Sequence, residues 1–382
     1  MKKTVQKKKV LIALSGGIDS AVSAYLLLKQ GYQVEAAFMR NWSSTKGLLK
    51  NDCPWLQDRQ DALRVAAFLG ISMHSLDFEK QYQKNVMNYF FKEYSAGRTP
   101  NPDVMCNKEI KFKLLYNWAI KNGFDYLATG HYAQVVESGK WKVDSKVSDH
   151  SLSTNHYSLI RSVDEFKDQT YFIYNIKTEQ LPHILFPVGG MKKKQVRALA
   201  KKIGLPNAEK KESMGLCFVG KIRLKDFLTQ KLKIKKGKII DQNNTVIGYH
   251  NGLHNYTIGQ RQGIGVGEKG PYYVYKKDLL TNTLFVTNNS KDKLLEIKEI
   301  DIHSVNWILP ELLKESQIQN SKFIVHISGR FRHQGKLVPL EVKQIKKDLY
   351  HIQFKSPQKA IASGQSLVLY EGKKCIGGGI IV

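Results

Sequence analysis

A glycine-rich segment near the start of the chain has the residue types of a phosphate-binding loop. It reads SGGIDS at positions 15–20 and follows an apolar run at 10–14. Glycines let backbone N–H groups approach phosphate oxygens, and a helix start adds partial positive charge. Asp19 would repel a bare phosphate, so its carboxylate suits either a Mg²⁺ ligand or a group that orients the loop. No Gly-Lys-Ser/Thr follows, which excludes a Walker loop.

A cysteine in a segment rich in proline and asparagine is the first candidate nucleophile. The segment 99–109 reads TPNPDVMCNKE and contains Cys106. We expect Asn107 to cap a following helix, which would put Cys106 just before a helix N-terminus, where partial positive charge favours the thiolate. Asp103 is placed to exchange protons with a reacting base. The alternative is a small buried thiol, and the polar neighbours argue against it.

The other cysteines are Cys53, Cys217 and Cys375, and none forms a C-x-x-C pair. A zinc site or a disulfide framework is therefore not expected. Cys217 lies in the apolar segment MGLCFVG, where burial is the ordinary interpretation, and Cys375 has the pattern of a core strand. His250 and His254 have i, i+4 spacing but sit among Asn and Gly, so we do not expect them to bind a metal, and we predict no resident metal site in the protein.

Composition limits the partners and the location of the protein. The formal net charge is +27, which favours a polyanion, either a nucleic acid or an acidic membrane surface. Lysine-rich genome bias would explain the same charge. No apolar run approaches the roughly 20 residues that span a bilayer, and the basic N-terminus lacks the apolar core of a signal peptide. We expect a cytoplasmic protein with no membrane partner.

The first third of the chain alternates strand and helix patterns. Strands are predicted at 10–14, 34–39, 71–78 and 125–129, with helices between them, including 61–69 and 83–94. This alternation is typical of an α/β fold with a parallel sheet. Ligands of such sheets lie beyond the carboxyl ends of the strands, so Met39 and Gly130, each at a strand end, are candidate neighbours of adenosine.

The remainder of the chain has a different pattern. A basic helix is predicted at 191–203, with a solvated face, and 137–156 has the character of a surface hairpin. The final ninety or so residues consist of short β-prone runs and turns. We predict an ATP-binding catalytic domain at 1–205, a central connector domain at 206–292 and a C-terminal β-barrel domain at 293–382.

Seven motifs follow one another along nearly the whole chain: SGGIDS, NPDVMCN, ATGHYA, KDQTYF, MGLCFVG, HNYTIGQRQGIGVG and SGRFRH. Together they resemble the tRNA-specific 2-thiouridylase family, within the superfamily of PP-loop ATP pyrophosphatases. The resemblance implies a parallel-sheet PP-loop domain, a small connector and a C-terminal β-barrel.

The resemblance also implies roles for individual residues. Cys106 matches the family's nucleophile, Cys217 its persulfide carrier and Asp103 its proposed acid–base group, with a transient disulfide between the two cysteines. The expected ATP-binding residues are Ala13, Leu14, Ser15, Gly16, Gly17, Ile18, Asp19, Ser20, Met39 and Gly130. The expected tRNA contacts are Asn101, Pro102, Asp103, His131, Lys167, Asp168, Gln169, Arg330, Phe331 and Gln365.

The implied reaction is thiolation of the wobble uridine of a tRNA, with ATP and Mg²⁺. Attack of the uridine O2 on the α-phosphate would form an adenylate, and a Cys217 persulfide would supply sulfur to C2. The tRNAs for Lys, Glu and Gln are the expected substrates, and a cysteine desulfurase or a sulfur-relay protein the expected donor. The sequence does not choose between direct persulfide attack and release of hydrosulfide.

Two other functions share part of this pattern. A PP-loop ligase or amidotransferase for a small molecule needs the SGGIDS loop but neither Cys106 nor Cys217. An RNA-binding module without chemistry explains the charge and the β-rich end but leaves the nucleotide loop unexplained. Pyrophosphate release that depends on added tRNA would distinguish all three.

Overall fold

The computed structural model describes residues 7–43, 54–138, 156–211, 224–229, 231–266, 271–308 and 324–382. Its N-terminal part is built on a five-stranded parallel sheet with the strand order β3-β2-β1-β4-β7. The strands are β1 (Lys9–Ala13), β2 (Gln33–Arg40), β3 (Met73–Asp77), β4 (Tyr126–Ala128) and β7 (Ile184–Leu185). The predicted α/β fold with a parallel sheet is confirmed.

The order of the strands reverses between β1 and β4. After β1 the chain moves outward to β2 and β3, and it then returns to β4 and β7 on the other side of β1. The loops that follow β1 and β4 lie at the carboxyl edge of the sheet, at the point of this reversal, which is where ligands of such sheets bind.

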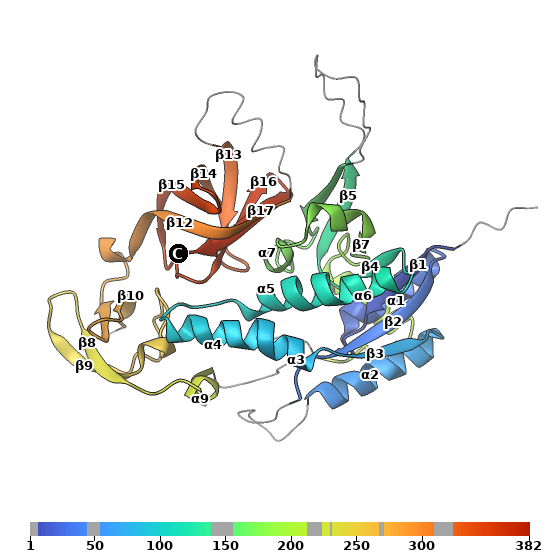
Figure 1. Cartoon of the computed structure of the whole chain (residues 1–382), viewed down its shortest axis with the longest axis horizontal. Helices are drawn as coiled ribbons and strands as arrows, with labels where there is room; N and C mark the ends of the chain where they lie inside the picture. The colour runs from blue at the N-terminus through green and yellow to red at the C-terminus, as the bar shows by residue number, and fades with distance from the viewer. Residues whose placement is uncertain are drawn as a thin grey trace, which may run out of the picture.

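Helices cover both faces of this sheet (Figure 1). One buried cluster joins the sheet to α1 (Ile18–Lys29), α2 (Pro54–Leu69) and α8 (Lys193–Lys202). The opposite cluster joins it to helices that run past the sheet toward the barrel. These are α3 (Glu79–Tyr82), α4 (Asn88–Ser95), α5 (Pro102–Cys106), α6 (Tyr116–Lys121), α7 (Thr170–Ile173) and the short α9 (Leu224–Thr229), with π-helical turns at Gln83–Met87 and Asn107–Leu115.

A small four-stranded sheet follows, in the order β10-β11-β8-β9. Its strands are β8 (Lys236–Ile240), β9 (Val246–Asn251), β10 (Tyr273–Asp278) and β11 (Thr283–Thr287). It encloses a separate core that includes Ile239, Val274 and Leu284. In Figure 1 this sheet lies below the barrel, at the end of α4 away from the parallel sheet.

The C-terminal part is a six-stranded antiparallel barrel, closed by pairing of β12 with β17. Its strands are β12 (Glu296–Trp307), β13 (Ile324–Arg330), β14 (Val338–Lys346), β15 (Leu349–Lys359), β16 (Ser366–Glu371) and β17 (Lys374–Ile381). Closure removes the unpaired edges that an open sheet of this length would expose. The predicted C-terminal β-barrel is confirmed.

The segment 137–156, predicted as a surface hairpin, lies between two paired strands. These are β5 (Ala133–Ser138) and β6 (His156–Arg161), and β6 extends the barrel sheet beside β17. The residues between them lie outside the described part of the chain. The parallel-sheet part and the barrel are thus joined by strand pairing.

No helix within the described ranges combines the length and apolarity needed to cross a bilayer.

Candidate nucleotide and thiol site

The SGGIDS segment forms a tight loop between β1 and α1. Gly16 has φ +74°, and a Cβ there would lie 2.3 Å from the carbonyl oxygen of Asp58 on α2. Glycine is therefore required both for the backbone conformation and for space. Gly17 is the N-cap of α1 and makes no side-chain cap, so the anion-binding end of the helix is not closed by its own cap residue.

The serines of the loop hold its shape. Ser20 Oγ donates to the carbonyl oxygen of Gly17 at 3.0 Å, lies 3.2 Å from Ser15 Oγ, and accepts from the backbone N–H of Ser15 at 3.2 Å. Ala13, Leu14 and Ile18 point into the core, so these expected ATP neighbours would offer their backbone to a nucleotide.

The end of β4 packs directly on this loop. A Cβ at Gly130 would lie 2.7 Å from the backbone nitrogen of Ser20 and 2.8 Å from the carbonyl carbon of Asp19. Only glycine allows this approach without moving α1. Met39, the penultimate residue of β2, is buried at the same edge of the sheet, beside Leu76 of β3. Both residues therefore lie at the carboxyl edge of the parallel sheet, and their contact with ATP stays a prediction.

Asp19 is held by two residues that the sequence did not single out. Tyr132 Oη donates to Asp19 Oδ1 at 2.9 Å, and Lys193 Nζ donates to both carboxylate oxygens at 2.7 and 2.8 Å. The side chain of Lys193 is 12% exposed and that of Asp19 is 32% exposed. Lys193 begins α8, so the basic face expected to be merely solvated contributes one lysine to the nucleotide loop. Basic residues fill that stretch, and their pattern does not single out Lys193.

The helix that carries Cys106 starts earlier than predicted. Asn101, not Asn107, is the N-cap, because its Oδ1 accepts from the backbone N–H groups of Asp103 and Val104 at 3.1 and 3.2 Å. Pro102 occupies the first helical position, which favours this start because proline has no N–H to leave unpaired. The expectation that Cys106 precedes a helix N-terminus is therefore wrong.

Cys106 is the last residue of α5, and the chain continues into a π-helical segment. Because the helix-terminal charge falls off within the first turn, it acts more strongly on Asp103 than on the thiol. Cys106 is fully buried, in the core cluster that also contains Ala13 and Met39. The polar sequence around this cysteine did not reveal its burial, because polar Asn107 is buried as well.

One short segment connects the nucleotide loop with the Cys106 helix. Gly130 packs on α1, whereas the ring of His131 lies 5.9 Å from that of Phe112, one turn and a half beyond Cys106. His131 is buried and its Nδ1 lies 2.7 Å from Thr129 Oγ1. Burial, and secondarily the charge of Lys111, lowers the pKa of His131 well below its usual value, so the ring is neutral at pH 7.

The second expected sulfur carrier, Cys217, lies outside the described residues, as does Cys53. The transient Cys106–Cys217 disulfide accordingly stays a prediction. Cys375 is a fully buried residue of β17, as its strand pattern indicated, and burial raises the pKa of its thiol far above the usual range.

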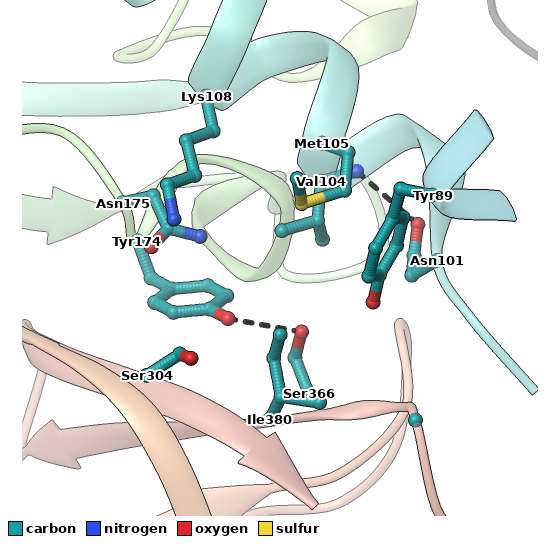
Figure 2. Close-up of a pocket in the computed structure, with 11 residues that line it drawn as sticks. Tyr89, Asn101, Val104, Met105, Lys108, Tyr174, Asn175, Ser304, Ser366 and Ile380 are labelled. Carbon is teal, nitrogen blue, oxygen red and sulfur yellow. Dashed lines mark hydrogen bonds between the residues drawn. The ribbon is translucent and has the colours of Figure 1, made fainter. Parts of the chain in front are cut away.

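A small pocket, partly open to solvent, lies between the Cys106 helix and the barrel. Figure 2 shows Lys108 and Asn175 together on one side of it and Tyr89 on the other. Tyr174 Oη lies 3.1 Å from Ser366 Oγ across the domain boundary. The other lining residues are Asn101, Val104, Met105, Ser304, Gly364 and Ile380.

Several predicted RNA contacts join the domains to each other. Asp168 is buried and accepts from Arg330 Nη2 at 3.1 Å and from Arg161 Nε at 3.0 Å. Arg330 is 2% exposed and lies over the ring of Tyr370. Contact of Asp168 or Arg330 with RNA stays a prediction, and it would require this buried group to open.

Two of the predicted RNA contacts are glutamines whose side chains form hydrogen bonds with backbone groups. Gln169 Oε1 accepts from the N–H of Tyr132 at 3.0 Å, and the N–H of Gln169 donates to the Tyr132 carbonyl at 2.9 Å. Gln365, in the turn before β16, donates to the carbonyl of Thr99 at 2.7 Å. This bond ties the barrel to the start of the segment that carries Asn101 and Asp103.

The remaining predicted contacts differ in accessibility. Lys167 is partly exposed in a turn in which its N–H donates to the carbonyl oxygen of Asp164 at 3.1 Å. Phe331 is partly buried against Phe354, with ring centroids 6.1 Å apart, so most of its face is already used. Pro102 is buried at the start of α5. None of these positions decides RNA binding by itself.

Asp19 offers the hard oxygen ligands that Mg²⁺ prefers. Among the described residues, no group of three or more His, Cys, Asp or Glu side chains is arranged to hold a metal ion. This donor set fits Mg²⁺ that arrives with nucleotide phosphates, which is how Mg²⁺ commonly binds.

Family models match the chain almost end to end. The model described as "tRNA methyl transferase HUP domain" matches residues 8–221, "tRNA methyl transferase PRC-barrel domain" matches 225–288, and "Aminomethyltransferase beta-barrel domain" matches 297–381.

Curated proteins named tRNA-specific 2-thiouridylase MnmA are similar over their full length. The protein of Buchnera aphidicola subsp. Schizaphis graminum is 42% identical, covering 98% of this chain and 97% of its own. That of Alkaliphilus oremlandii is 43% identical, covering 100% and 99%. That of Lysinibacillus sphaericus is 41% identical, covering 98% and 94%.

Proposed function

Because this chain belongs to the tRNA-specific 2-thiouridylase family, we propose that it replaces the C2 oxygen of a tRNA wobble uridine with sulfur at the expense of ATP. One structural observation carries the proposal most directly. The segment 129–132 contacts the nucleotide loop through Gly130 and the Cys106 helix through His131. The SGGIDS loop and the helix that carries Cys106 thus pack against the same strand end, which supports the proposal that ATP and the thiol act on one base.

The first step is activation of the base. The C2 oxygen is a poor leaving group, so attack of O2 on the α-phosphate, with release of pyrophosphate, would convert it into an adenylate. Gly16, Gly17 and the start of α1 would receive phosphate oxygens. Mg²⁺ would offset phosphate charge when bound, with Asp19 as its candidate protein ligand.

The second step is sulfur transfer. The terminal sulfur of a Cys217 persulfide would attack C2. Cys106 would attack the inner sulfur, which forms the Cys106–Cys217 disulfide and leaves the transferred sulfur on C2 as AMP departs. A thiol reductant would then restore both cysteines. Release of hydrosulfide before attack is the alternative order. Asp103 would exchange the proton of the base.

The substrates and partners follow from the family. We propose the tRNAs for Lys, Glu and Gln as substrates, and a cysteine desulfurase or a relay protein as the sulfur donor. The base must be splayed from the anticodon loop to reach a buried thiol, as enzymes that act on nucleobases require. The net charge of +27 favours the polyanionic partner.

The test is reconstitution with tRNA transcript, ATP, Mg²⁺ and a persulfide donor, followed by nucleoside mass spectrometry. Wild type should give thiouridine, and Cys106→Ser and Cys217→Ser should abolish it, while Cys217→Ser still releases pyrophosphate on addition of tRNA. Normal thiolation by either variant would overturn the two-thiol scheme. A methylated product, in line with the family-model descriptions, would overturn the function itself.

The same assay addresses the competing functions. Pyrophosphate release triggered by a small molecule without tRNA would favour a small-molecule ligase. Tight tRNA binding with no pyrophosphate release under any condition would favour an RNA-binding protein without chemistry.

A further inference from the structure

The ion pair between Asp19 and Lys193 raises an electrostatic question about the nucleotide loop. Asp19 is the second residue of α1, beside the glycines that would receive phosphate. A carboxylate at this position repels a nucleotide polyphosphate, and partial burial strengthens the repulsion. The ammonium of Lys193 lies 2.7 and 2.8 Å from its two oxygens. The sheet edge therefore carries a cation where the incoming ligand is anionic.

Lys193 is positioned by contacts that reach beyond Asp19. Its backbone N–H donates to Asp164 Oδ2 at 2.8 Å, which fixes the start of α8 against the turn before Lys167. Its ammonium also lies 5.8 Å from the ring centroid of Tyr132, whose hydroxyl donates to Asp19. With 12% of its side chain exposed, the lysine cannot swing freely into solvent. Its ammonium therefore lies between the loop that follows β1 and the segment that follows β4.

We propose that Lys193 is a phosphate-binding residue of the nucleotide site, an inference that rests on the proposed ATP-dependent function. When a Mg²⁺ nucleotide enters, the Asp19 carboxylate turns to the metal ion and the Lys193 ammonium turns to a phosphate oxygen. One ion pair is exchanged for two, so charge stays balanced throughout. A lysine is suited to this role because its ammonium is a compact point charge on a flexible stem.

α8 packs against α1 through both apolar and polar contacts. The apolar face of α8 packs in the core through Val196 and Ala200, which are both buried. The contact of Lys193 with Asp19 adds a polar connection at the end of the helix nearest the loop. Loss of the lysine should therefore affect ligands that carry phosphate and spare those that do not.

The experiment measures ligand binding by calorimetry on the full chain, with Mg²⁺ present. The ligands are an ATP analogue with a methylene bridge between the α- and β-phosphates, inorganic pyrophosphate, and adenosine. We expect Lys193→Met to weaken binding of the analogue and of pyrophosphate by about ten-fold or more and to leave adenosine unchanged. Lys193→Arg should retain part of the affinity.

The matched control is Lys194→Met, which removes the next, exposed lysine of the same helix. It should bind all three ligands as wild type does. Wild-type affinity of Lys193→Met for the analogue and pyrophosphate would overturn the proposal. An equal loss of affinity for adenosine would also overturn the proposal, because that result would show that the substitution distorts the whole loop.

A double variant separates direct contact from mere neutralisation of Asp19. If Lys193 only cancels the aspartate's charge, Asp19→Asn combined with Lys193→Met should recover phosphate affinity, and that recovery would overturn the proposal. If Lys193 contacts phosphate, the loss should persist. Failure of the wild-type protein to bind the ATP analogue would instead count against the proposed function.

Discussion

Asp168 and Arg330 form an ion pair of 3.1 Å whose two side chains are 0% and 2% exposed. Asp168 precedes α7 in the ATP-binding part, and Arg330 ends β13 of the barrel. Arg161 of β6 shares the carboxylate, and Thr170 Oγ1 donates to its other oxygen at 2.9 Å. A residue that the sequence assigned to RNA contact is thus a buried link between the parallel-sheet part and the barrel.

Asp168→Asn should destabilise the protein strongly. The variant leaves the guanidinium groups of Arg161 and Arg330 buried without a counter-ion, and loss of one partner of a buried pair costs about 3–5 kcal/mol. Chemical denaturation monitored by fluorescence will measure the change. Glu371→Gln is the control, because its pair with Lys374 is 3.7 Å long and about half-exposed, and it should change stability by less than about 1 kcal/mol. Equal effects of the two variants would contradict the assignment.

Gly130→Ala should damage the nucleotide loop. The new methyl would meet backbone atoms of Asp19 and Ser20 at 2.7–2.8 Å, and backbone cannot yield as a side-chain tip can. We expect overpacking to cost about 1–3 kcal/mol and tRNA-dependent pyrophosphate release to fall by about ten-fold or more as α1 shifts. The measurements are thermal unfolding and a pyrophosphate assay.

Gly190→Ala is the matched control for that variant. The nearest atom to its added Cβ is Gln134 Oε1 at 3.9 Å, an ordinary contact. It should retain activity and stability. Normal pyrophosphate release by Gly130→Ala would show that the close packing of β4 on α1 does not shape the loop.

The sequence predicted the fold where local pattern and long-range packing agree. Alternation of apolar strands and helices gave the parallel sheet, and the glycines of SGGIDS marked the loop because close backbone approaches admit no other residue. Asn107 was a plausible cap by residue type, but Asn101 followed by Pro102 forms a better one. Residue type alone did not distinguish the two asparagines as candidate N-caps.

Other features depend on contacts far apart in the chain. Asp19 and Lys193 are separated by 174 positions, and no local signal marks one lysine in a basic helix as its partner. The burial of Asp168 and Arg330 likewise follows from the docking of the barrel, which charge patterning does not encode. Residue type therefore did not predict the accessibility of these side chains.

Cys375→Ala should leave thiolation intact, unlike Cys106→Ser. Cys375 is fully buried in β17, and its raised thiol pKa keeps it protonated at neutral pH, so it cannot serve as a nucleophile. Nucleoside mass spectrometry will measure product, and iodoacetamide labelling of the native protein should leave Cys375 unmodified. Loss of thiolation in a stably folded Cys375→Ala protein would contradict this expectation.

Lys277 of β10 should make stability depend on pH. Burial lowers its pKa from 10.5 to about 8, and its ammonium donates to the Tyr256 carbonyl at 2.9 Å. Between these values the unfolded chain binds more protons than the folded one, so the free energy of unfolding should rise as pH increases from about 8 to 10.5. Because the residue is only half-buried by its accessible surface, we expect a gain on the order of 1 kcal/mol.

Lys277→Met should abolish this rise, and Lys276→Met, its exposed neighbour on the same strand, should preserve it. Denaturation midpoints measured at intervals from pH 7.5 to 10 will show the difference, since His254, whose pKa is lowered, titrates below this window. Burial raises the thiol pKa of Cys375, which lowers the free energy of unfolding across the upper part of this window, and tyrosines with raised pKa, such as Tyr94 at about 12, do so at higher pH. Both effects are the same in all three proteins, so the contribution of Lys277 is measured as the difference between the wild-type and variant profiles. Parallel pH profiles for wild type and Lys277→Met would mean that Lys277 stays charged in the folded protein throughout this range.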